Sequence, residues 1–250
     1  MVLAASHGTS SHDGQAAVRR LVDAVAASLD VDVIGCHVDV ERPDVPTALA
    51  RAAEAAERAL IVPLLLSAGY HVFVDLAEAA DASPLPTTVT PALGPDLRLI
   101  DVLVRRLVEA GYRPGDEVVL AAAGSSDPRA VADCHRTTAL LAARLGSTVS
   151  TGFISAAMPP LGEAVAAARS RRPGGRVVIA TYLLAPGYFA DLASAAGAHL
   201  VAEPLLTPSS TPQELVEIVL NRVTDARKVE AAPYDTRGES PAVHHPATVA

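Results

Sequence analysis

The sequence contains no tryptophan and few other aromatic residues, with three Phe and five Tyr among 250 residues. Half of the residues are nevertheless hydrophobic, so the core must be aliphatic, as in helices packed on a buried parallel sheet. The only two cysteines, Cys36 and Cys134, lie far apart and form no CxxC pair. This argues against a disulfide scaffold or a zinc knuckle and indicates a reducing interior.

Basic charge is also scarce, since 20 Lys and Arg stand against 28 Asp and Glu, for a net charge of −8. A nucleic-acid-binding face would need a basic patch, and the one dense cluster, "RSRR" (169–172), is interpreted as a solvated helix end. No apolar run approaches the ~20 residues that span a bilayer, and no charged leader precedes an apolar segment. We expect a soluble cytoplasmic protein with neither nucleic-acid nor membrane partners.

Short apolar runs alternate with Ala-rich segments of helical period, which is typical of βα units. The pattern then repeats: "EVVLAAAGSSD" (117–127) aligns with "MVLAASHGTSS" (1–11), an offset of 117 − 1 = 116. One long repeat predicts a duplicated domain. Strands are expected at 1–6, 31–40, 59–66 and 86–91, and helices at 14–29, 45–57, 70–82 and 95–111.

The expected fold class is α/β, with two tandem duplicated domains that each hold a four-stranded parallel sheet covered by helices on both faces. The N-terminal domain is predicted over 1–113 and the C-terminal domain over 114–227, separated by the turn cluster "YRPGDE" (112–117). The polar, Pro-containing segment 228–250 has no periodicity and is predicted to be disordered.

Three side chains able to bind a metal follow three predicted strands of the first copy. His7 and Asp39 end the first and second strands, and His71 follows the third. Ligands bind outside the carboxyl ends of such strands, and two imidazoles with a carboxylate suit Fe²⁺, Co²⁺, Ni²⁺ or Zn²⁺. The second copy has Ala123, Ser155 and Phe189 at these positions. The groups that differ are therefore needed for a ligand and not for the fold.

Other interpretations of these residues stay open. A histidine at a strand end can simply satisfy a hydrogen bond, and Asp39 could cap the helix expected near residue 45. His37 lies on the same strand face as Asp39, but its counterpart Phe153 favours a packing role. His12 is expected near a helix start, and Glu41 could replace Asp39 as the acidic ligand.

Two Gly/Ser turns, "HGTSS" (7–11) and "GSSD" (124–127), enter helices and offer backbone N–H groups to an anion. Neither has the lysine of a Walker loop. No GxGxxG follows a strand, and no GxSxG nucleophile elbow occurs.

The stretches "ASHGTSS", "VDVERPDV" and "VPLLLSAGYHVFVD" resemble, in order and spacing, the class II tetrapyrrole chelatases, and more narrowly the sirohydrochlorin chelatases. The resemblance covers about residues 1–225. It implies insertion of Fe²⁺ or Co²⁺ into sirohydrochlorin for sirohaem or cobalamin biosynthesis. The implied metal ligands are His7, Asp39 and His71, with the two histidines also catalytic, although many relatives have Glu at the acidic position.

The resemblance further implies a cleft between the two halves that takes the tetrapyrrole. We expect no cofactor beyond the divalent metal, which is itself a substrate, and a monomer, because the duplication builds the cleft within one chain. The main alternative is a non-catalytic carrier of tetrapyrrole or metal. The choice among iron, cobalt and nickel stays open. Candidate substrate-binding residues are Ser10, Ser67, Ala68, Gly69, Tyr70, Ser125, Ser126 and Arg129, with Arg42 and Arg136 as further cations.

Overall fold

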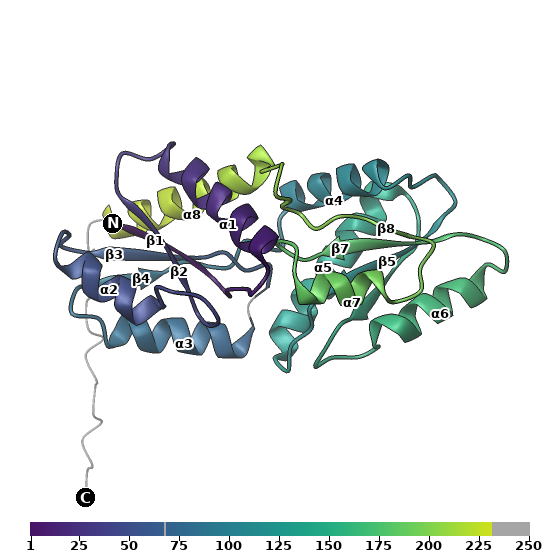
Figure 1. Ribbon diagram of the computed structural model, residues 1–250, viewed down its shortest axis with the longest axis horizontal. Coiled ribbons are helices and arrows are strands. Elements are labelled where there is room, and N and C mark those ends of the chain that lie inside the picture. The colour runs from purple at the N-terminus through teal and green to yellow at the C-terminus, as the bar shows by residue number, and fades with distance from the viewer. Residues whose placement is uncertain (68, 232–250) are drawn as a thin grey trace, which may run out of the picture.

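The computed structural model describes residues 1–67 and 69–231, and at residues 70–73, 230 and 231 it describes the backbone alone. Two four-stranded parallel sheets lie side by side along the long axis, one from each copy of the repeat (Figure 1). Their strand orders are equivalent, β2-β1-β3-β4 and β6-β5-β7-β8, which confirms the predicted tandem α/β fold. The strands are β1 Val2–Ser6, β2 Val33–His37, β3 Ala59–Pro63, β4 Thr87–Val89, β5 Glu117–Ala122, β6 Val149–Phe153, β7 Val177–Tyr182 and β8 Leu200–Val201.

Central strands are buried on both faces, which explains why they are continuous apolar runs in the sequence. In β1, Val2 and Ala4 face one core cluster, while Leu3 and Ala5 face another on the opposite side of the sheet. Helices cover both faces of each sheet, as predicted. They are α1 His12–Ala26, α2 Val45–Ala53, α3 Tyr70–Asp81, α4 Leu97–Glu109, α5 Pro128–Leu145, α6 Leu161–Arg171, α7 Tyr188–Ser194 and α8 Gln213–Ala231.

Side-chain caps fix the beginning of several helices at the sheet edges. Ser11 Oγ accepts a hydrogen bond from Gly14 N at the start of α1, and Asp44 Oδ1 accepts one from Thr47 N at the start of α2. Such caps satisfy backbone donors that the first turn leaves unpaired. Because Asp44 caps α2, Asp39 does not have that role.

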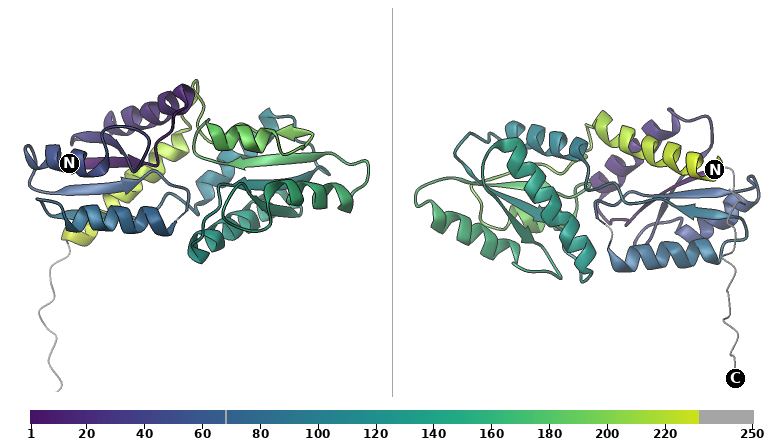
Figure 2. Two further views of the ribbon diagram at one scale, coloured as in Figure 1. Left: turned by 60° about the horizontal axis from the view of Figure 1, so that its bottom comes forward. Right: turned by 180° about the vertical axis from the view of Figure 1, so that it is seen from behind.

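The last helix of each copy packs on the other copy's sheet. Helix α4 contacts α5 and β7, whereas α8 contacts α1 and β3; α8 lies across the first sheet in both Figure 1 and the right view of Figure 2. The predicted boundary near residue 113 separates the two copies of the sequence repeat. In space, however, α4 of the first copy packs with the second sheet, and α8 of the second copy packs with the first sheet.

One core cluster runs through both halves because of this exchange. It contains the inner-face residues of β1 and β3 together with those of β5 and β7, along with α4 and α8. The segment from residue 228, predicted to be disordered, begins inside α8, which continues to Ala231; residues 232–250 lie outside the described chain. Within the described residues, no helix combines the length and hydrophobicity needed to cross a membrane.

Both cysteines are buried, and their ionisation predicts how stability changes in alkali. Burial raises the pKa of the Cys36 thiol to about 12. Burial also raises the pKa of the Cys134 thiol to about 11. A hydrogen bond with Ser67 lowers this pKa in part, and the charge of Asp133 raises it. In the unfolded chain a thiol ionises near pH ~8.5. Below that pH the thiols are neutral in both states, and their contribution to the free energy of unfolding is fully present. As the pH rises toward the folded pKa values, only the unfolded chain ionises, so this contribution is lost.

We expect the free energy of unfolding to fall by about 1.4 kcal/mol per pH unit for each thiol above about pH 9. Urea denaturation across this range measures the slope, and Cys36→Ala is the matched variant, because removing one buried thiol should make the slope shallower. An unchanged slope in Cys36→Ala would contradict this account.

Candidate functional site

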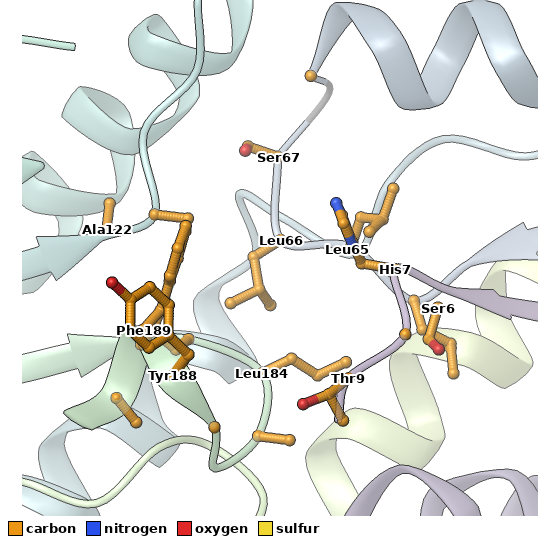
Figure 3. A pocket seen from close by; sticks show the side chains of 18 of the residues that line it. Ser6, His7, Thr9, Leu65, Leu66, Ser67, Ala122, Leu184, Tyr188 and Phe189 are labelled. Atoms are coloured by element: carbon orange, nitrogen blue, oxygen red, sulfur yellow. The ribbon is translucent and has the colours of Figure 1, made fainter. Parts of the chain in front are cut away.

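A cavity of about 710 Å³ lies between the carboxyl ends of the two sheets. The loops that line it follow β1, β2 and β3 in the first half and β5, β6 and β7 in the second. Figure 3 shows His7 and Thr9 on one side of it and Tyr188 and Phe189 on the other. This is the edge where the sequence placed its candidate ligands, and the volume is typical of small-molecule sites.

His7 is positioned by a tight turn that both copies share. Gly8 has φ +93°, and a Cβ on it would lie 2.0 Å from the Asp39 carbonyl oxygen; Gly124 has φ +91° and meets the Ser155 carbonyl oxygen in the same way. The turn therefore requires glycine. His7 is exposed and lines the cavity, and its imidazole forms no hydrogen bond to the described part of the chain.

Glu41 is the carboxylate that lines this side of the cavity. Its Oε1 accepts a hydrogen bond from Thr9 N at 2.8 Å and lies 3.7 Å from His37 Nδ1. His37 Nδ1 is itself hydrogen-bonded to Ser6 Oγ at 2.8 Å. The half-buried His37 therefore supports the loop that carries Glu41 and is not among the cavity-lining residues.

Asp39 is placed differently from what the strand prediction implied. Strand β2 ends at His37, and Asp39 follows it in an exposed bend. Its Oδ1 accepts a hydrogen bond from Val40 N at 2.7 Å. Asp39 is not among the cavity-lining residues, whereas Glu41, two residues later, is.

The loop after β3 forms another part of the wall. Ser67 and Gly69 line the cavity, and a Cβ on Gly69 would lie 3.6 Å from Ser125 Oγ of the second half. Predicted site residue Ala68 lies outside the described residues, as do the side chains of Tyr70 and His71, whose backbone begins α3. The described residues contain no cluster of three groups able to hold a metal.

The second half supplies a mostly apolar wall. Predicted residues Ser125 and Ser126 line it, as Ser10 lines the first half. Tyr182 O–H donates to the Leu66 carbonyl oxygen at 2.8 Å across the two halves, and burial raises the pKa of this hydroxyl. Sequence reasoning missed Leu64–Leu66 and the segment 182–190 as lining residues. The signal was the repeat itself, since 182–190 matches the residues around His71.

No Arg or Lys is found among the cavity-lining residues of the described chain. Arg129, predicted to bind substrate, has a side chain that is 72% exposed and pairs with Asp127 at the start of α5. The cations Arg42 and Arg136 are likewise exposed and pair with Asp44 and Asp133. The structure brings none of the three to the cavity wall.

The two halves touch where the loop after β7 meets the start of α1. A Cβ on Gly14 would lie 2.3 Å from the Pro186 carbonyl oxygen and 2.9 Å from Thr9 Cγ2. Gly14→Ala must therefore push the halves apart, and we expect it to lower the free energy of unfolding by about 1–3 kcal/mol.

The matched control is Gly162→Ala in α6, where a Cβ would meet nothing within 4 Å. Alanine is expected to stabilise that helix by about 0.5–1 kcal/mol. Thermal or urea unfolding of the two variants compares them directly. Equal changes in the free energy of unfolding of the two variants would show that a Cβ at residue 14 can be accommodated without separating the halves.

The CbiX family model matches residues 1–110 and again residues 117–226. Among solved structures, SirB from Bacillus subtilis with Fe³⁺ is 21% identical, with TM-score 0.76 over 92% of this chain and 97% of that one. The structure of CbiX from denitrifying bacteria, described as the terminal enzyme of sirohaem biosynthesis, is 22% identical, with TM-score 0.65 over 90% and 98% of the two chains. These structures share the fold. No curated protein matches the sequence significantly.

Proposed function

Since the chain belongs to the CbiX family over both of its halves, we propose that it is a sirohydrochlorin chelatase. Such a metal chelatase, of the lyase class, inserts Fe²⁺ or Co²⁺ into the sirohydrochlorin macrocycle in sirohaem or cobalamin biosynthesis. The observation that carries the proposal is the cavity between the two sheet edges, with His7 and Glu41 on one wall and an apolar wall opposite. The SirB structures were solved with Fe³⁺ and with cobalt, and this supports a metal substrate of the same class.

The reaction exchanges one M²⁺ for the two pyrrole N–H protons of the ring. A neutral imidazole is both a metal ligand and a proton acceptor near neutral pH. His7 has no competing hydrogen bond in the described chain, so we propose that it holds the incoming metal and accepts a proton as metal–nitrogen bonds form. His71 is proposed, from the resemblance of its motif, as the second imidazole and as the acceptor of the other proton. No cofactor besides the metal substrate is proposed.

We propose Glu41 rather than Asp39 as the carboxylate that faces the metal. Glu41 lines the cavity and is held by Thr9 N, whereas the Asp39 carboxylate accepts from its neighbour Val40 N. A carboxylate beside imidazoles suits a divalent first-row metal.

Two isosteric variants separate the carboxylates. Glu41→Gln keeps an acceptor for Thr9 N but removes the charge, and we expect insertion to slow by about 10–100-fold. Asp39→Asn should stay within about threefold of the wild type, because Asp39 does not line the cavity. Initial rates of metal insertion measure both effects. A larger loss of rate in Asp39→Asn than in Glu41→Gln would show that Asp39 is the carboxylate that faces the metal.

The direct test mixes purified protein, sirohydrochlorin and Co²⁺ or Fe²⁺ without oxygen and follows the change in absorption. The proposal expects insertion faster than the spontaneous rate. No acceleration would overturn it, and ring binding without acceleration would indicate a carrier. Competition between the two metals in the same assay decides the preferred one. We also propose a monomer, since one chain supplies both walls of the cavity. A cytoplasmic location is proposed from the two unpaired cysteines, which indicate a reducing compartment.

A further inference from the structure

The two walls of the cavity differ in chemistry more than the fold requires. The first half contributes six polar side chains, those of Ser6, His7, Thr9, Ser10, Glu41 and Ser67, beside the aliphatic Val18, Val40 and Leu64–Leu66. The second half contributes chiefly Ala, Leu and aromatic residues, among them Ala122, Leu184, Tyr188 and Phe189. Because the backbone is duplicated, this contrast reflects side-chain choice and not architecture.

Within the part of the chain that the structure describes, the Phe and Tyr residues that line the cavity all belong to the second wall. The chain holds only eight Phe and Tyr and no Trp, yet Tyr182, Tyr188 and Phe189 all line this cavity. Tyr182 is buried at 2% exposure and bonds to Leu66 O, so its role is structural. Tyr188 and Phe189 remain available to a ligand.

Tyr188 and Phe189 begin the short helix α7 and form an adjacent pair. Their ring centroids are 6.1 Å apart at 49°, and Tyr188 is 69% exposed. An aromatic ring left this open on a cavity wall is not explained by core packing. Figure 3 shows both rings on the side of the cavity opposite His7.

The absence of Arg and Lys from the described lining constrains how a carboxylate-rich ring can bind there. Charged contacts cannot supply the attraction for the body of the ring, so apolar burial and stacking must. Flat conjugated surfaces favour offset stacking on aromatic side chains. The carboxylates can then remain at the rim, in water.

We infer that Tyr188 and Phe189 form a stacking platform for one face of the tetrapyrrole, which leaves its other face toward His7. The inference rests on the proposed function and adds to it the side from which metal enters: the first half. Tyr188 and Phe189 occupy the repeat positions of Tyr70 and His71. The tyrosine is common to both copies, so the divergence into a metal-handling copy and a ring-handling copy would lie at the second position, where His71 corresponds to Phe189.

The test is a titration of protein with metal-free sirohydrochlorin, followed by its absorption and fluorescence. Tyr188→Leu and Phe189→Leu, which keep apolar bulk but remove the flat ring, are each expected to weaken ring binding about tenfold. The conservative variants Tyr188→Phe and Phe189→Tyr should bind within about twofold of the wild type. Co²⁺ binding without the ring should not change in any of them.

The control is Leu192→Ala, on the same helix but outside the cavity lining, which should bind the ring as the wild type does. Unaltered ring binding in both leucine variants would overturn the platform while leaving a chelatase that still accelerates insertion. A wild type that binds the ring but does not accelerate insertion would overturn the proposed function, and weaker binding in the leucine variants would still support the platform. If ring binding weakened equally in the leucine variants and in Leu192→Ala, together with a lower thermal stability, this would count against a specific role of Tyr188 and Phe189.

Discussion

His7→Ala is expected to reduce metal insertion by at least about 100-fold without unfolding the protein. Removing a group that holds the metal and accepts a proton typically costs this much or more. The fold should survive, because the exposed imidazole makes no hydrogen bond to the described chain and the second copy makes the same turn with Ala123. The thermal midpoint and circular dichroism should therefore match the wild type.

The matched control is His12→Ala, at the first residue of α1. His12 is exposed and is not among the cavity-lining residues, so insertion should stay within about twofold of the wild-type rate. Binding of Co²⁺ alone should weaken in His7→Ala and not in His12→Ala. Normal insertion by His7→Ala would refute the site assignment, whatever the fold of the variant.

Much of the fold was predictable because the relevant physics is local. Buried parallel strands require continuous apolar runs, and the helices between them require an apolar stripe, so the repeated βα pattern can be found by period alone. The turn at Gly8 and Gly124 could also be found, since only glycine fits a left-handed turn pressed against a neighbouring carbonyl.

The exchange of α4 and α8 could not be predicted in the same way. Their apolar stripes show that each helix packs on a sheet, but not on which of two equivalent sheets. That choice depends on the path of the irregular connections that lead from β4 into α4 and from β8 into α8. Periodicity contains no information about it.

The candidate site was predicted in outline and not in detail. The rule that ligands lie beyond the carboxyl ends of strands led to His7 and to the loops of Ser10, Ser67 and Ser125, and these residues line one cavity. It could not separate Asp39 from Glu41, because that depends on where β2 ends and how the next bend turns. The sequence also suggested Arg129 as a substrate-binding residue, but Arg129 forms an ion pair with Asp127 and is not among the cavity-lining residues.

The exchanged helices lead to the largest expected effect on stability, at Arg106 of α4. This side chain is 6% exposed, and it donates from Nε to the Pro204 carbonyl oxygen at 3.1 Å and from Nη2 to that of Leu205 at 3.0 Å. Arg222 of α8, at 222 − 106 = 116 residues further along, does the same for Ala92 and Leu93. Each arginine thus ties its helix to the other copy's half.

Arg106→Met is expected to lower the free energy of unfolding by about 3 kcal/mol, because two buried carbonyls lose a charged donor while the apolar stem is kept. Arg105→Met is the matched control on the same helix: Arg105 is 43% exposed and pairs with Glu214, a surface ion pair worth about 1 kcal/mol or less. Urea unfolding measures both. Since one core cluster joins the halves, a single transition should shift as a whole in Arg106→Met. Equal losses in the two variants would show that the exchanged helices are held by general packing alone, whereas two separated transitions would show that Arg106 couples halves able to unfold independently.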